Sequence, residues 1–385
     1  MALSPRNKKI LSALAVGVAV FVLMGGLRLT RWLEVAEHKA LDHLVRRYAD
    51  PAKADSSLLL LAIDESSLEA LGRWPWPRDR HGFVVRYLKE AGAKAVVFDV
   101  MFFEPDENAE EYDHSFADDL AAAGNVFLPM LFQAEPSSLP PDLLSRVTVP
   151  VARRGDREGA AVPHEAGVKT PIPLLAQQAR GLGVINLSAD ADGPTRRIPL
   201  LGLVNGKAMP HLSLAVARHL LGTEQVVLEE DRLQIGPRSV PLEPDGTMLL
   251  DWHGPLEQTY HVGKYSVGRV LQAFAQQQRG ERPSLDPTLF KDKVIFIAGT
   301  AAGLYDLRVT PFSSATPGVL IHMAALDNLL HGRALSSAPA WFSFLTLLVL
   351  CVTSAGAFML PRSYPVKFGV TLALALAYYG LAVHA

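Results

Sequence analysis

Three long apolar runs without charged residues stand out from the rest of the chain. They cover residues 10–27, 339–360 and 368–383. A helix needs about 20 apolar residues to cross the hydrocarbon layer of a membrane, so we expect membrane helices over 10–29, 339–361 and 366–384. The first run is longer than the apolar part of a typical signal peptide and lacks an A-x-A cleavage site, which favours a retained anchor over a cleaved peptide.

Basic residues beside these runs predict the orientation of the chain. Arg6, Lys8 and Lys9 precede the first run, and Arg362 and Lys367 lie between the second and the third. Lys and Arg favour the cytoplasmic side of a membrane, so we expect a cytoplasmic N-terminus (1–9) and an extracytoplasmic segment over 30–338 of a multi-pass inner (plasma) membrane protein. Three crossings leave the end of the chain outside, so we expect a truncated receptor that continues beyond Ala385.

The first part of the external segment is expected to be a juxtamembrane helix over 30–50. Trp32, Ala36, Ala40, Leu44 and Tyr48 recur every four residues, which is the spacing of one helix face. This apolar stripe either packs on its own domain or forms the seam of a homodimer.

The next part alternates between apolar strands and amphipathic helices, as in α/β domains. Runs that are apolar throughout are typical of strands buried on both faces of a sheet. The predicted strands are 58–63, 95–98, 126–131 and 293–298, and the predicted helices are 81–91, 110–123 and 318–330. The fold class predicted is therefore an α/β extracytoplasmic domain with a mixed, partly parallel sheet, plus transmembrane α-helices.

The middle of the segment is less regular. Residues 133–173 are rich in Pro and Gly and are expected to form an irregular insertion. Shorter strands, expected to be antiparallel, are predicted over 183–187, 197–204, 225–228, 233–235 and 247–252, with helices over 212–221 and 266–278. His211, at the start of the first of these helices, and His219 within it are expected to be solvated; the alternative is that they sense pH.

Composition excludes several classes of protein. The 385 residues carry a formal net charge of −2, whereas a nucleic-acid binder normally has a clear excess of Lys and Arg. Cys351 is the single cysteine, which excludes an intramolecular disulfide framework and a thiolate zinc cluster. We therefore expect no nucleic-acid partner. The three apolar runs predict instead that the chain contacts a lipid membrane.

Polar residues at the ends of the predicted parallel strands are the candidates for ligand binding, because ligands of open α/β sheets lie outside the carboxyl ends of the strands. Arg78 and His322 are added as nearby polar groups. The candidate ligand-binding residues are Asp64, Arg78, Asp99, Thr300, Asp306, Thr310 and His322. The alternative is that the aspartates serve only as helix caps and turn residues.

Enzyme signatures are incomplete or missing. The glycine-rich stretch 299–303 lacks the Lys-Ser/Thr of a P-loop, and the histidines form no HExxH pair. We expect no catalytic residues, no metal and no cofactor; a cation beside Asp64, Asp99 and Asp306 has no further support. The competing hypothesis is a cell-surface hydrolase that uses Asp64, Asp99 and His322.

Several blocks of sequence occur in a characteristic order. The most diagnostic are KVIFIAGTAAGLYDLRVTPF (293–312) and PGVLIHMAALDNLL (317–330), and the others are IDESSL (63–68), RWPWPRDRHGF (73–83), AGAKAVVFDVMFFEP (91–105) and DADGPTRRIPL (190–200). In their order and residue types these blocks resemble the CHASE2 extracellular sensory domain.

This resemblance implies a receptor module that relays an unknown small-molecule or physical signal through its membrane helices to a cytoplasmic effector absent from this chain. Class III adenylate or guanylate cyclases are the effectors expected first, with adenylate cyclase preferred; histidine kinases and Ser/Thr kinases are the alternatives. The chain itself is then not an enzyme. A purely dimerising structural module is a further alternative.

Overall fold

The computed structural model describes residues 31–154, 161–260, 264–304 and 306–359, together with isolated residues on either side of this range. The chain divides into two compact units. One unit is Tyr48–Ser336, and the other consists of Met1–Arg47 and Ser337–Ala385. The second unit contains most of helix α2 (Arg31–Tyr48) and helix α12 (Ala340–Phe358).

The predicted membrane helices fall in the second unit. Among the described residues, no helix combines the length and the apolar character that a membrane crossing requires. The segments 10–29 and 366–384 lie largely outside the described residues, and α12 lies within the expected segment 339–361. The three crossings therefore stay predictions.

A mixed, mainly parallel sheet forms the centre of unit 48–336. Six parallel strands follow the order β15-β1-β16-β2-β3-β7, and β6 pairs antiparallel with β3. The strands are β1 (Leu58–Ile63), β2 (Ala95–Asp99), β3 (Val126–Gln133), β6 (Gly167–Lys169), β7 (Gly181–Val184), β15 (Tyr265–Ser266) and β16 (Val294–Gly299). The α/β fold with a partly parallel sheet is thus confirmed.

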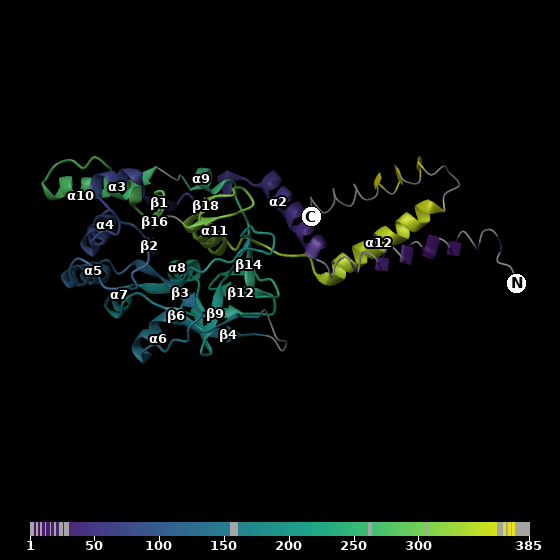
Figure 1. The fold of residues 1–385 in the computed structure, drawn as a ribbon, viewed down its shortest axis with the longest axis horizontal. Helices are drawn as coiled ribbons and strands as arrows, with labels where there is room; N and C mark the ends of the chain where they lie inside the picture. Colours follow the sequence, from purple (N-terminus) through teal and green to yellow (C-terminus); the bar gives the residue numbers. More distant parts are fainter. Residues whose placement is uncertain are drawn as a thin grey trace. The chain divides into compact units, whose positions relative to one another are not determined.

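Helices cover both faces of this sheet (Figure 1). The connections β1→β2, β2→β3, β3→β7 and β15→β16 all advance in the same direction along the sheet, and right-handed crossovers then place their helices on one face. These helices are α3 (Glu65–Leu71), α4 (Arg78–Glu90), α5 (Glu110–Ala123), α6 (Pro141–Val147), α7 (Pro173–Gln178) and α10 (Val267–Gln278). The other face is covered by α8 (Leu212–Leu220) and α11 (Gly318–His331), which pack against each other.

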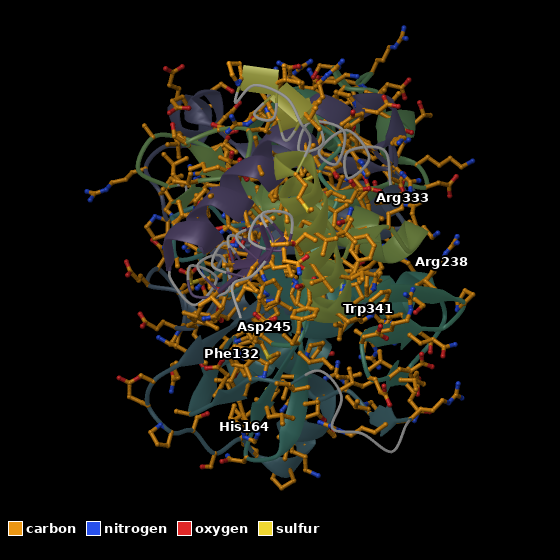
Figure 2. The ribbon with its side chains drawn as sticks, turned by 90° about the vertical axis from the view of Figure 1, so that its right-hand side faces the viewer. Phe132, His164, Arg238, Asp245, Arg333 and Trp341 are labelled. Atoms are coloured by element: carbon orange, nitrogen blue, oxygen red, sulfur yellow. The ribbon has the colours of Figure 1, made fainter. Side chains whose placement is uncertain are left out.

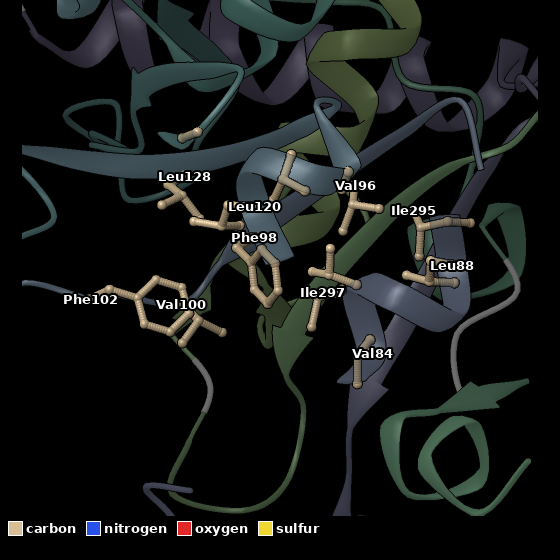
Figure 3. Close-up of a cluster of buried hydrophobic side chains, with 14 of the residues drawn as sticks. Val84, Leu88, Val96, Phe98, Val100, Phe102, Leu120, Leu128, Ile295 and Ile297 are labelled. Atoms are coloured by element: carbon tan, nitrogen blue, oxygen red, sulfur yellow. The ribbon is translucent and has the colours of Figure 1, made fainter. Parts of the chain in front are cut away.

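The core lies between the sheet and the first group of helices (Figure 3). Alternate residues of the central strands, such as Phe98 of β2 and Ile297 of β16, point to this side, because successive side chains of a strand face opposite ways. They pack against Val84 and Leu88 of α4 and Leu120 of α5, all fully buried. Burial on both faces explains why these strands are apolar throughout.

Smaller sheets make up the rest of the unit. They have the strand orders β10-β9-β5, β13-β12-β11-β4, β19-β14-β8 and β17-β18. The strands are β4 (Val151–Arg153), β5 (His164–Glu165), β8 (Arg197–Pro199), β9 (Leu201–Val204), β10 (Lys207–Pro210), β11 (Val226–Leu228), β12 (Arg232–Ile235), β13 (Arg238–Pro241), β14 (Thr247–Leu250), β17 (Leu307–Arg308), β18 (Thr316–Pro317) and β19 (Ala334–Leu335). The short helix α9 covers Leu256–Thr259, and single 3₁₀ turns cover Pro51–Lys53 and Pro287–Phe290.

The sheet that contains β9 contacts the central sheet at Phe132 of β3. The strand β9 passes so close that a side chain on Gly202 would meet the Phe132 ring, and β9 also pairs with β5, which carries His164 (Figure 2). On another side of the unit, Arg333 follows α11 and leads into β19, beside the β13 strand that begins at Arg238.

Two expectations about the middle segment differ from the structure. Residues 133–173, expected to be irregular, contain α6, β4, β5 and β6, because strands of two or three residues are too short to show a period. The strand predicted over 183–187 begins earlier, at Gly181, and the expectation that it is antiparallel is wrong, since β7 runs parallel to β3. Strand direction depends on partners that are distant in the sequence.

Candidate functional site

The carboxyl ends of β1, β16 and β2 lie side by side, as the sequence predicts. Ile63 is level with Gly299, and Ala298 is level with Asp99. Beyond them lies a cavity of about 100 Å³, which we call the strand-end pocket. Its lining residues are Asp99, Met101, Ile185, Ala298, Gly299, Leu304, Asp306, Pro317, Gly318, Val319 and His322. Three of the seven candidate residues, Asp99, Asp306 and His322, therefore share one pocket.

Asp99 is the last residue of β2, and its carboxyl group lines the pocket. No hydrogen bond joins this carboxyl to another described residue. Burial, with a smaller contribution from the negative charge of Asp306, raises the pKa of Asp99 to about 7. The carboxyl is therefore partly protonated at neutral pH, and it can donate as well as accept a hydrogen bond.

Asp306 lies in the loop between β16 and β17, and its charge is balanced locally. The Arg308 Nε atom donates to Asp306 Oδ2 at 2.8 Å, and Arg308 Nη1 reaches the carbonyl oxygen of Leu187 at 3.5 Å. The backbone oxygen of Asp306 accepts the amide hydrogen of Gly318, the first residue of α11, at 2.9 Å. The loop and the start of α11 are thus held together at the rim of the pocket.

His322 of α11 also lines the pocket. Its side chain is buried, and its Nδ1 atom has no hydrogen-bond partner among the described residues. Burial, followed by the positive charge of Arg308, lowers the pKa of His322 to about 3, so the imidazole is neutral. A neutral imidazole beside a carboxyl of raised pKa offers both a donor and an acceptor to a small polar guest.

The block 190–200 contains a buried ion cluster. Arg196 is fully buried and donates to Asp190 at 3.0 Å and to Asp192 at 2.7 and 2.9 Å. The amide of Thr195 donates to the Val309 carbonyl oxygen at 2.8 Å and so holds the segment directly after β17. The block 190–200 therefore has a structural role in positioning the connection between β17 and β18.

Three other candidate residues have local structural roles. Asp64 is the N-cap of α3 and accepts hydrogen bonds from the amide of Ser67 at 2.9 Å and from its hydroxyl at 2.6 Å. Thr300 donates its amide hydrogen to the Ile63 carbonyl oxygen at 2.9 Å. Thr310 is buried, with its hydroxyl 3.1 Å from that of Thr316. None of the three lines the strand-end pocket.

Arg78, the remaining candidate, lies in a different cavity of about 280 Å³ that is also lined by Trp74 and Trp76. Its guanidinium packs over the ring of Phe102 with its carbon 4.8 Å from the centroid, and its Nε atom lies 3.5 Å from Asp113 Oδ1. Arg78 therefore holds α4, the segment after β2 and α5 together.

The geometry gives little support to metal binding or hydrolysis at the strand ends. Asp64, Asp99 and Asp306 do not form a close group of ligand atoms among the residues that the structure describes. No hydrogen bond links Asp64, Asp99 and His322 in this part of the chain, as a nucleophile–base pair would require. The pocket has room for a few water molecules or one small ion and is smaller than the roughly 300–1,000 Å³ of metabolite sites.

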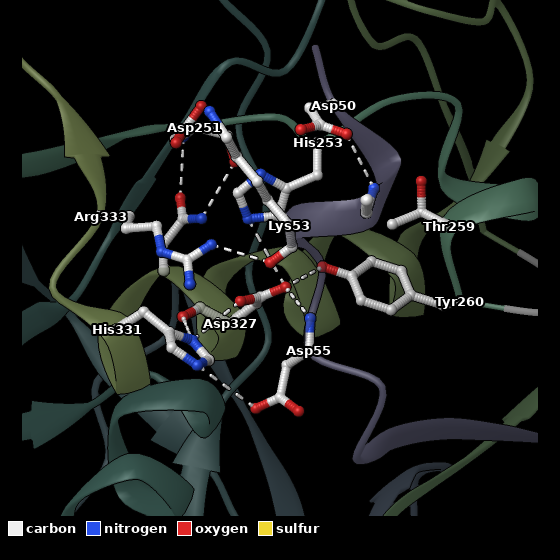
Figure 4. A network of polar contacts seen from close by, with 12 residues as sticks. Asp50, Lys53, Asp55, Asp251, His253, Thr259, Tyr260, Asp327, His331 and Arg333 are labelled. Carbon is white, nitrogen blue, oxygen red and sulfur yellow. Dashed lines mark hydrogen bonds and ion pairs between the residues drawn. The ribbon is translucent and has the colours of Figure 1, made fainter.

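A second polar cluster was not predicted. Asp327 of α11 is fully buried, yet its carboxylate is surrounded by donors (Figure 4). Its Oδ2 atom accepts from the amide of Asp55 at 2.9 Å and from the Tyr260 hydroxyl at 3.1 Å, and lies 3.6 Å from His253 Nε2. His331 Nδ1 lies 3.1 Å from Oδ1. Burial alone would raise the pKa of Asp327, but the nearby His253 ring and the hydrogen bonds from Asp55 and Tyr260 lower it.

This Asp327 cluster joins the two ends of unit 48–336. The carbonyl oxygen of Lys53 accepts from Arg333 Nη1 at 2.8 Å. Beside it, Asn328 makes two bonds with the backbone of Asp251, at 2.8 and 3.0 Å (Figure 4). The hydrogen bonds of these two side chains go to Asp55, Tyr260 and Asp251. Two adjacent polar residues in an otherwise apolar helix were the signal that could have indicated this cluster.

The histidines of α8 also differ from expectation. His211 is fully buried and caps the helix by accepting the amide hydrogen of Ser213 at 3.2 Å, and burial lowers its pKa well below the ordinary value. The expectation that it is solvated is wrong because α8 packs between the sheet and α11. His219, near the end of the helix, is partly exposed.

Comparison with known proteins completes the picture. Neither the curated proteins nor the solved structures contain a match to this chain. One family model matches, that of the CHASE2 domain, over residues 17–358. The matched range includes the whole of unit 48–336 with the strand-end pocket and the Asp327 cluster. The chain therefore belongs to the CHASE2 family of extracellular, non-catalytic sensory domains.

Proposed function

We propose that this chain is the sensor of a membrane receptor. In this proposal the helices over 10–29, 339–361 and 366–384 anchor it in the inner membrane, and unit 48–336 lies outside the cytoplasm. A small polar cue or a change in protonation at the strand-end pocket alters the unit and is relayed to a cytoplasmic effector, a class III adenylate cyclase. The observation that carries the proposal is the CHASE2 match over most of the chain.

Helix α11 supplies a physical route for the relay. Gly318 and His322, in its first half, line the strand-end pocket, whereas Asp327 and Asn328, in its second half, belong to the Asp327 cluster. That cluster holds segment 50–55, where the chain enters the unit, to Arg333, where the chain leaves it. A cue that prefers one position of α11 would shift the populations of two arrangements of these ends.

The topology is tested with alkaline phosphatase, which is active only outside the cytoplasm. Fusions after residues 336 and 364 of the full chain should give high and low activity, respectively. Equal activity at both positions would contradict a membrane crossing between them.

The effector is tested by reading the gene beyond codon 385. A further membrane segment followed by a class III cyclase domain is the expected result. A kinase domain in that place would overturn the cyclase assignment while leaving the sensor intact, and a stop codon directly after Ala385 would overturn the relay to a covalently linked effector.

A further inference from the structure

Unit 48–336 has a further cavity that is larger than the strand-end pocket. It lies at the amino ends of the parallel strands, whereas the strand-end pocket lies at their carboxyl ends. It has a volume of about 430 Å³ and lies where β3 and β7 begin, beside Phe127 and Gly181. Arginines from three separate segments line it: Arg146 of α6, Arg180 before β7 and Arg218 of α8. We call this cavity the arginine cleft. Its volume lies within the range of sites that bind small molecules.

The positive charge of the cleft is not balanced by acidic side chains. No ion pair joins Arg146, Arg180 or Arg218 to a carboxylate among the residues that the structure describes. Glu224 lines the cleft too, but it is the backbone oxygen of Glu224 that accepts a hydrogen bond from Arg218. The lining of the cleft therefore contains three guanidinium groups and one carboxylate, that of Glu224.

The arginines are fixed by neutral groups that leave donors unused. Arg146 donates to the carbonyl oxygens of Ala176 and Ala179 at 3.3 and 2.6 Å, at the end of α7. Arg180 Nε donates to His219 Nδ1 at 3.1 Å. The buried Nε atom of Arg218 has no hydrogen-bond partner among the described residues. Guanidinium groups held in this way are ready for the paired hydrogen bonds that carboxylates and phosphates accept.

His219 adds a further donor. Because its Nδ1 atom accepts the hydrogen bond from Arg180, the neutral ring carries its proton on Nε2. Burial, then the charges of Arg180 and Lys94, lowers the pKa of His219. Burial also lowers the pKa of Arg218, an effect that the nearby negative charge of Glu224 opposes. In both groups the largest cause is the removal of the cation from water.

We propose that the arginine cleft binds a small organic anion that carries two or three carboxylate or phosphate groups. Three arginines from different segments can engage separate anionic groups, which a single chloride cannot provide. The volume of the cleft exceeds what one inorganic ion would fill. This site is separate from the strand-end pocket, and the proposal does not depend on the relay to an effector.

The test is isothermal titration of the purified full chain in a non-ionic detergent at constant ionic strength. The probes are citrate and glycerol 3-phosphate, with glycerol as the neutral control. We expect one citrate site, weaker binding of glycerol 3-phosphate and none of glycerol. In Arg180→Gln and in Arg218→Gln, citrate affinity should fall about tenfold or more, because each loses charge-assisted hydrogen bonds.

Arg154→Gln is the matched control. Arg154 is exposed and lies 3.5 Å from Glu229, away from the cleft. Its substitution should leave citrate affinity unchanged, and an equal loss in this variant would overturn the proposal in favour of general surface charge. Absence of binding of both anions to the unsubstituted chain would overturn it as well. Arg180 is exposed, so Arg180→Gln should fold even where Arg218→Gln does not.

Discussion

One partly buried and one fully buried carboxyl group in this protein have opposite pKa shifts, and their partners explain the difference. Asp99 faces a cavity with no hydrogen bond from a described residue, and burial raises its pKa to about 7. Asp327 is more deeply buried, but the His253 ring beside it and its donors Asp55 and Tyr260 lower its pKa. The same chemical group is thus kept ready to accept a proton at one end of α11 and kept ionised at the other.

Asp99 should make the stability of the protein depend on pH. Its folded pKa exceeds its unfolded value, so the unfolded chain releases the proton first and stability falls as the pH rises from about 4 to about 7. Asp99→Asn removes this loss and should stabilise unit 48–336 by about 1–2 kcal/mol at pH 8, from roughly 1.4 kcal/mol per pKa unit with an allowance for partial exposure. Urea unfolding followed by tryptophan fluorescence at pH 5 and pH 8 measures this.

The control for this prediction is Asp231→Asn, at an exposed aspartate. Its stability should follow that of the unsubstituted chain at both pH values. If Asp99→Asn also follows it, the carboxyl of Asp99 is ionised normally and the strand-end pocket is wetter than its geometry indicates.

Asp327→Asn should be strongly destabilising. The substitution removes a buried anion that several donors share, at a cost of about 3 kcal/mol. Since the folded pKa of Asp327 is lowered, its contribution is present above the ordinary value near 4 and is lost as the pH falls through the folded value. The gap in unfolding free energy between the two proteins should therefore narrow below about pH 4. A cost below about 0.5 kcal/mol at pH 7 would show that the Asp327 cluster is not structural.

At the level of secondary structure, the elements that could be predicted from the sequence are those whose residues follow a local apolar pattern. The buried strands β1, β2 and β16 appear as continuous apolar runs and α11 as a mainly apolar one. The carboxyl-end rule brings Asp99 and Asp306 to one pocket, which also contains His322, the residue added as a nearby polar group. The partners of Asp327 and the composition of the arginine cleft could not be predicted. Asp55 and Asp327 are 272 positions apart, and Arg146, Arg180 and Arg218 belong to separate segments that only the tertiary fold brings together.

Two glycines lie where neighbouring strands and helices of the unit pack closely. An added Cβ on Gly183 of β7 would lie 2.4 Å from the backbone Cα of Leu212, at the start of α8, whereas one on Gly202 of β9 would meet the ring of Phe132 at 2.4 Å. The Phe132 side chain can swing aside by a change of χ1, but the backbone of a packed helix cannot yield as easily. Gly183→Ala should therefore cost about 3 kcal/mol and Gly202→Ala about 1–2 kcal/mol, as measured by urea unfolding. The reverse order would mean that α8 can move away from β7 at little cost.

On the scale of the whole unit, α11 lies where the separate features meet. It follows the central strand β16, its first turn lines the strand-end pocket, and its end contributes to the Asp327 cluster (Figures 1 and 4). The apolar residues between these sites are buried against the sheet, α8 and β14. Densely packed interiors transmit strain, so a change at the pocket should reach segment 50–55 through this helix.

Hydrogen exchange can test this coupling in the full chain. His322→Gln keeps a polar side chain but alters the pocket; we expect faster exchange of the Asp55 and Asp251 amides, whose acceptors are the side chains of Asp327 and Asn328. The expected change is about threefold or more, corresponding to at least about 0.6 kcal/mol of local opening free energy. Arg154→Gln, far from α11 in the sequence and exposed, should leave both amides unchanged. If exchange in His322→Gln speeds up only in the 299–318 loop, then α11 is a rigid support, and a signal at the strand-end pocket must leave the unit by another path.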